Sequence, residues 1–95
     1  MAITPIPVGK GNKVFSTAAP TTTAAQALAA NNSRTSALIY NNGSVTVYLG
    51  KDNTVTSSTG LALVAQASLE DKESIDAWWA VTASGTGDLR IVEVS

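Results

Sequence analysis

The sequence predicts an all-β domain, a β-sandwich or jelly-roll-like barrel of about seven or eight short strands. Three observations predict this class. Serine, threonine, valine and glycine are abundant, while charged residues make up only 14% of the chain. Runs of β-branched and aromatic residues recur about every ten residues, with turn-forming residues between them. Within the run 45–49, apolar and polar residues alternate, which is typical of a strand with one buried face.

A chain of 95 residues is expected to form one domain, here spanning residues 13–95 and preceded by an extended arm at residues 1–12. Two prolines in the arm fix φ and lack a backbone donor. The arm is nevertheless apolar at Ile3, Ile6 and Val8. We therefore expect it to dock on its own sheet or on a neighbouring subunit, with a frayed terminus as the alternative.

The expected strands follow from the positions of the apolar runs. The segment 24–30 has the highest helix propensity in the chain but is too short for a stable helix, so we predict a strand or extended chain there. We predict hairpin turns at 41–44 and 84–88, because Asn and Gly accept positive φ, and a solvated turn at 71–74. The remaining strands are expected at 13–17, 34–40, 45–50, 54–56, 61–64 leading through Ala65 into 66–70, 75–83 and 89–94.

Composition argues against several classes of function. The net charge is −1 and the six basic residues are scattered, so no footprint for nucleic acid is expected. The chain has no histidine and no cysteine, which leaves no imidazole base, disulfide or thiolate metal site. The carboxylates between Glu70 and Asp76 match no calcium loop and indicate solvated surface. We expect no catalytic residue, no cofactor and no metal, and predict that the protein is not an enzyme.

The sequence predicts neither a signal peptide nor a membrane-spanning helix. The first residues have neither a basic region nor a long apolar region, so no signal peptide is predicted. No apolar run approaches the ~20 residues of a membrane helix. The expectation is synthesis in the cytoplasm and no membrane partner.

Among the sequence features, only the adjacent tryptophans Trp78 and Trp79 indicate a binding site. Neighbouring residues of a strand face opposite sides, so one tryptophan enters the core and the other faces outward. The phase of Val81 and Ala83 places Trp79 in the core and leaves Trp78 exposed. An exposed Trp78, near Tyr48 or Tyr40, would anchor a protein interface or stack on a sugar ring. The alternative is that both are buried, one of them beneath the N-terminal arm.

Residues 33–95 resemble small β-domain structural proteins of tailed bacteriophages. The resemblance rests on the series from Thr35 to Gly50, the segments 53–56 and 60–69, and the end from Trp79 to Val94. It implies a virion protein made in the host cytoplasm, of the capsid decoration (cement) or head-fibre type. Such a protein would bind the major capsid protein or another virion protein, most often as a trimer.

The resemblance favours a capsid decoration protein that stabilises the head, with Ile3, Ile6, Val8, Trp78 and Tyr48 as contact residues. Two alternatives stay open. A carbohydrate-binding module would use Trp78 and Tyr48, and a head–tail or tail accessory would act elsewhere in the same virion.

Overall fold

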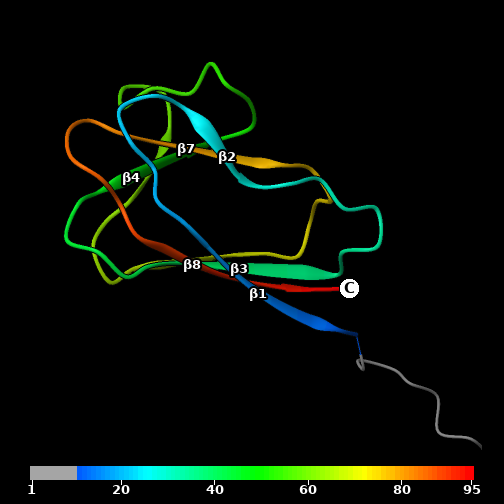
Figure 1. Ribbon diagram of the computed structural model, residues 1–95. Helices are drawn as coiled ribbons and strands as arrows, with labels where there is room; N and C mark the ends of the chain where they lie inside the picture. Colours follow the sequence, from blue (N-terminus) through cyan, green and yellow to red (C-terminus); the bar gives the residue numbers. More distant parts are fainter. Residues whose placement is uncertain (1–10) are drawn as a thin grey trace, which may run out of the picture.

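The computed structural model describes residues 11–95, which form eight β-strands and no helix (Figure 1). The predicted all-β class and strand number are confirmed, and the segment 24–30 contains a strand. The strands are β1 (Lys13–Ala18), β2 (Ala25–Leu28), β3 (Ser36–Asn41), β4 (Val47–Gly50), β5 (Leu61–Leu63), β6 (Ser68–Asp71), β7 (Trp78–Thr82) and β8 (Leu89–Val94).

The strands form two four-stranded antiparallel sheets that face each other as a sandwich (Figure 1). Sheet A has the order β1-β8-β3-β6 and sheet B the order β2-β7-β4-β5. Strand β1 pairs with β8, β2 with β7, β3 with β6 and β4 with β5, as in one long hairpin. The pairs β3–β8 and β4–β7 form when this hairpin rolls up, and they complete the sheets. This is the strand arrangement of a jelly roll.

The core lies between the sheets and consists of aliphatic side chains from both. Val47 and Leu49 are buried on β4 while Tyr48 between them is only half-buried, so the predicted alternation is confirmed. Burying a valine, leucine or isoleucine stabilises a fold by roughly 1.5–3 kcal/mol relative to leaving it exposed. The buried cluster contains Leu28, Ala37, Ile39, Val47, Leu49, Leu63, Ala80, Leu89 and Ile91.

The prediction of hairpin turns at 41–44 and 84–88 is wrong, because each segment connects one sheet to the other. The buried Asn41 side chain stabilises the first corner. Its Nδ2 donates to the carbonyls of Val45 and Leu63 at 2.9 and 2.8 Å, and its Oδ1 accepts from the amide of Gly43 at 3.0 Å. Turn residues signal that the chain reverses, but these long-range contacts decide which sheet the next strand joins.

The strand predicted at 54–56 is also wrong. Residues 51–60 form a loop that folds back over the outer face of sheet B, with Val55 buried against Gly50 and Gly60. A Cβ atom at Gly50 would lie 2.5 Å from the Cβ of Val55, so only glycine permits this approach. Val81 points outward from β7 but is buried, and it lines the same depression as the loop residues Thr54–Thr56.

One end of the sandwich is held by the buried guanidinium of Arg34, whose side chain has no exposed surface. Its Nε donates to Glu93 Oε2 at 2.7 Å. Its terminal nitrogens donate to the carbonyls of Ala29 at 2.7 Å and Asp76 at 2.8 Å. One side chain therefore joins β8 to the β2–β3 and β6–β7 connections.

Candidate functional site

Of the five predicted contact residues, the structure describes only Trp78 and Tyr48, and it does not bring these two together. Ile3, Ile6 and Val8 belong to residues 1–10, outside the described residues, so their role stays a prediction. Trp78 and Tyr48 lie on opposite faces of sheet B. Trp78 packs against the core, whereas Tyr48 points outward, with Gly60 close to its Cβ.

The prediction that Trp79 enters the core while Trp78 is exposed is wrong. Trp78 lies opposite Leu28 and contacts the buried cluster, and Trp79 lies opposite Gln26 and Gly50 on the outer face. The prediction depends on the phase of Val81, which is buried on the outer side because the loop 51–60 covers it. An apolar residue under a loop has the same sequence signature as one between the sheets.

Asp71 holds Trp78 in place and orders the connection between β6 and β7. Its Oδ2 accepts hydrogen bonds from Trp78 Nε1 at 2.9 Å and Ser74 Oγ at 2.8 Å. Its Oδ1 accepts from the amides of Glu73 and Ser74 at 2.9 and 3.1 Å. The prediction of a fully solvated turn is therefore wrong at Asp71, which is buried, although Lys72 and Glu73 are exposed.

The Asp71 carboxylate makes stability depend on pH. Burial favours the neutral form, but the four hydrogen bonds outweigh it and lower the pKa of Asp71 to about 2. Because this pKa is below its unfolded value, the stabilisation is present above about pH 4 and is lost as the pH falls toward 2. We expect the wild type to lose about 1–2 kcal/mol of unfolding free energy over this range through Asp71.

Denaturant unfolding at neutral pH and at about pH 2 measures this loss, with Asp71→Asn as the reference. The variant is expected to be less stable at neutral pH and to have a shallower acid dependence than the wild type. Identical acid dependence in the two proteins would show that another carboxyl group is responsible.

The strongest candidate for a binding surface is the outer side of sheet A, which we call the sheet A face. It consists of Phe15 on β1, Val92 and Arg90 on β8, and Leu38 and Tyr40 on β3. Val92 lies opposite both Phe15 and Leu38, which makes an apolar row across three strands. Arg90 lies opposite Tyr40 in the next row. Phe15 is 76% exposed and Leu38 37% exposed.

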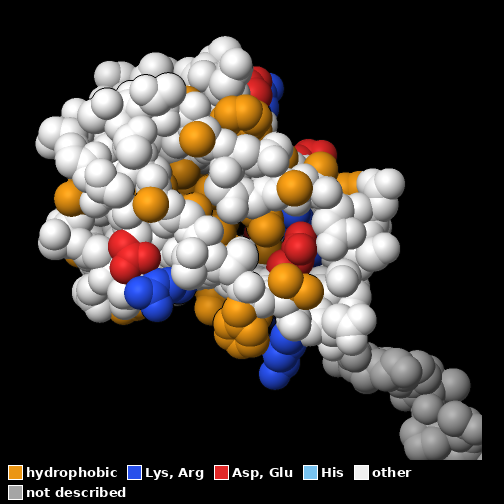
Figure 2. Space-filling view, in the orientation of Figure 1, with side chains coloured by type: hydrophobic (Ala, Val, Ile, Leu, Met, Phe, Trp, Pro, Cys, Tyr) orange, Lys and Arg blue, Asp and Glu red, His pale blue; other side chains and the backbone are white. Residues whose placement is uncertain are grey.

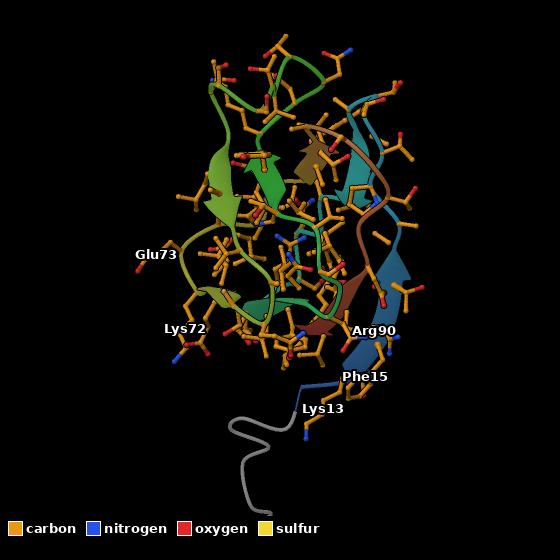
Figure 3. All side chains as sticks on the ribbon, turned by 90° about the vertical axis from the view of Figure 1, so that its left-hand side faces the viewer. Lys13, Phe15, Lys72, Glu73 and Arg90 are labelled. Carbon is orange, nitrogen blue, oxygen red and sulfur yellow. The ribbon has the colours of Figure 1, made fainter. Side chains whose placement is uncertain are left out.

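The sheet A face is shallowly hollowed and carries charge at its margin. A groove of about 340 Å³ runs between the side chains of the face and also touches Ser16 and Thr17. Figure 3 shows Phe15 pointing away from the sandwich, with Lys13 and Arg90 on the same side. In Figure 2, orange side chains and a basic group lie at the lower edge, where Figure 1 draws β1 and β8. The face thus has an apolar centre with Lys13 and Arg90 at its margin on one side, and with Glu70 of β6 opposite Leu38 on the other.

Arg90 is positioned by its neighbour Asp88. The guanidinium donates through Nε and one terminal nitrogen to the two carboxylate oxygens, at 3.1 and 3.2 Å. The hydrogen bond from Arg90, together with that from Asn42, lowers the pKa of Asp88. Asp88 is therefore ionised at neutral pH and fixes the orientation of the guanidinium beside Tyr40.

Sequence reasoning missed the sheet A face, although a signal for it exists. Segments 37–40 and 89–94 contain apolar or aromatic residues in both phases of the strand period. A strand buried on one side leaves its second apolar set outside, where solvent, a loop or a partner must cover it. On sheet B the loop 51–60 covers part of this outer side, whereas Phe15 and Leu38 on sheet A stay exposed.

The described residues give little support to a chemical site. Among residues 11–95, no three His, Cys, Asp or Glu side chains are grouped to hold a metal ion. No helix in this part of the chain could cross a membrane. The sheet A face offers apolar contact, two aromatic rings and a guanidinium, which are the means of binding another molecule.

Comparisons with protein-family models, with curated proteins and with solved structures find no match to this chain. The fold and the face together define a class, a small jelly-roll domain with an exposed apolar face on one sheet.

Proposed function

We propose that this chain is a structural protein of a bacteriophage virion. In this role it is a capsid decoration protein that binds the assembled head and stabilises it by bridging major capsid subunits. The observation that carries the proposal is the apolar row of Phe15, Val92 and Leu38 on the sheet A face. The resemblance of residues 33–95 to small phage β-domains supplies the setting.

The composition of the sheet A face supports protein binding. Interfaces are enriched at their centre in aromatic residues and arginine and are bordered by polar residues. Here Phe15 and Tyr40 supply the rings and Arg90 the guanidinium, while Thr17 and Ser68 lie at the two ends of the same row. Large contiguous apolar patches on the surface of small domains mark interaction sites.

The packed core beneath the sheet A face makes it a rigid surface, which suits permanent attachment to a shell. Its central strands, β8 and β3, bury Ile91 and Ile39 on their inner side, at 2% and 0% exposure. Backbone held by a packed core changes little on binding, so little conformational entropy is lost on forming the complex. A protein that cements a shell needs such a rigid surface and needs no reacting group.

Leu38→Lys tests the proposal. The side chain is partly exposed in the apolar row, between Val92 and Glu70, so the variant is expected to fold normally but to place a charge within the apolar contact. We expect at least about a ten-fold loss of affinity for assembled heads that lack the protein, measured by co-sedimentation. Leu61→Lys is the matched control, because Leu61 is 54% exposed on β5 of the other sheet.

Each outcome of this experiment decides something. Equal binding by the wild type and Leu38→Lys would remove the sheet A face from the proposal. Failure of the wild-type protein to bind heads would contradict the decoration role itself. Binding to purified tails instead would favour a tail accessory of the same virion.

A further inference from the structure

Among residues 11–95, no strand pairs with the outer edge of β1 in sheet A, and a single lysine at its first residue is the only feature there that protects an edge. Strand β1 is six residues long, its register against β8 is regular, and its only charged residue is Lys13. Five of its six residues are exposed. An exposed edge strand readily pairs with a further strand unless it is short, bulged or charged.

The other three edges of the two sheets are all protected in one of these ways. Strand β6 carries Glu70 and Asp71, with Lys72 directly after it. Strand β2 has four residues and a register shift between Gln26 and Leu28. Strand β5 has only three residues. Among the edge strands of residues 11–95, β1 is the least protected, because it is long and regular and carries one charge, at its first residue.

The backbone groups that β1 presents at its open edge follow from its pairing with β8. Asn12 and Ser95 exchange both hydrogen bonds, N to O at 2.7 and 3.1 Å, so they form a hydrogen-bonded pair. Such pairs alternate along an antiparallel ladder, which places the bonds to β8 on Val14, Ser16 and Ala18. The N–H and C=O groups of Lys13, Phe15 and Thr17 therefore point away from the sheet.

We propose that β1 pairs antiparallel with β1 of a second copy of this chain, about a two-fold axis at Phe15. In this register Phe15 lies opposite Phe15 of the second copy, and Lys13 lies opposite Thr17. The three outward N–H and three outward C=O groups of each copy then all find partners, in six hydrogen bonds. A two-fold axis at Val14 or Ser16 would leave some of the outward N–H and C=O groups of Lys13, Phe15 and Thr17 without a partner in β1 of the second copy.

The side chains also suit this register. Phe15 meets its copy across the new strand pair, and aromatic cross-strand pairs are favourable. The apolar row Phe15, Val92 and Leu38 becomes continuous across the axis. Lys13 meets the uncharged Thr17, so no like charges lie opposite one another. The product is an eight-stranded sheet with isologous contact, as a two-fold dimer requires.

The inference does not rest on the proposed function, and it is tested on the purified full-length chain without heads. Sedimentation equilibrium from about 1 µM to about 1 mM is expected to show monomer and dimer in exchange, because a single strand pair is a small interface. Phe15→Lys and Phe15→Glu are each expected to weaken the dimer at least about ten-fold, because like charges then face each other at the axis. An equimolar mixture of the two variants is expected to regain a dimer, since the introduced lysine of one copy would face the introduced glutamate of the other.

A second pair of variants tests the backbone hydrogen bonds between the two β1 strands separately from the contact between the Phe15 rings. Thr17→Pro removes an outward N–H while leaving the N–H groups that bond to β8 in place, and proline is tolerated on an edge strand. We expect it to weaken the dimer, whereas Thr17→Val is expected to retain it. Circular dichroism and thermal melting of each variant confirm that the monomer is folded.

Several results would overturn the inference. A wild-type protein that is monomeric at the highest concentration has no such contact. A trimer, which the resemblance implies, would require another interface. Dimerisation of Phe15→Lys at the wild-type strength, or a mixture of the charge variants that stays monomeric, would exclude the register centred on Phe15.

Discussion

Replacing Arg34 with alanine is expected to lower the free energy of unfolding by about 3–5 kcal/mol, because it removes one partner of a buried ion pair. The substitution leaves the Glu93 carboxylate, 14% exposed, without its guanidinium. It also leaves the carbonyls of Ala29 and Asp76 without their donor. In a domain of this size we expect the melting temperature to fall by more than about 10 °C.

Arg90→Ala is the matched control for Arg34→Ala. Arg90 also bonds to a carboxylate, that of Asp88, but its side chain is 55% exposed and solvent replaces the lost contact. Differential scanning calorimetry of both variants compares a buried with an exposed ion pair of the same type. If Arg34→Ala and Arg90→Ala have the same melting temperature, the hydrogen bonds and ion pair of Arg34 contribute nothing to stability.

Replacing Asn41 with alanine is expected to lower the free energy of unfolding by about 2–4 kcal/mol, because it leaves buried backbone groups without partners. The side chain has 0% exposure and makes all three of its hydrogen bonds to backbone. Its loss removes the donor to Val45 and Leu63 and the acceptor for Gly43. Urea denaturation measures the effect through the midpoint and the slope.

The neighbouring Asn42 gives the control for Asn41. It is exposed, and its side chain donates to Asp88 Oδ2 at 3.0 Å. Asn42→Ala is therefore expected to change the midpoint little. A loss in Asn41→Ala as small as that expected for Asn42→Ala would mean that the three hydrogen bonds of Asn41 do not stabilise the corner.

The two contacts hold opposite ends of the same strand. Arg34 lies just before β3 and Asn41 is its last residue, and between them β3 presents Leu38 and Tyr40 on the sheet A face. Both contacts stabilise the surface on which the proposed attachment depends. A variant that loosens either end is expected to bind heads less well through stability, so binding is compared only between variants of equal melting temperature.

Part of the candidate site was accessible from the sequence. Leu38, Tyr40 and Val92 lie in strands that the sequence predicts, and the apolar character of both strand phases is visible there. Their convergence with Phe15 was not predictable, because β1 and β3 are neighbours only through β8, at the other end of the chain. The prediction for Trp78 is wrong because a loop, and not the opposite sheet, buries Val81.

The sequence by itself determined the class, most of the strands and the alternation along β4, because strand periodicity and turn chemistry act between residues close in the chain. Only the tertiary structure decided which sheet each strand joins, which tryptophan faces the core and why Asp71 and Arg34 are buried. These features depend on contacts between distant residues, such as Arg34 and Glu93, which are 59 positions apart. A period of two places side chains on alternate faces, but which face becomes the interior depends on what packs against it.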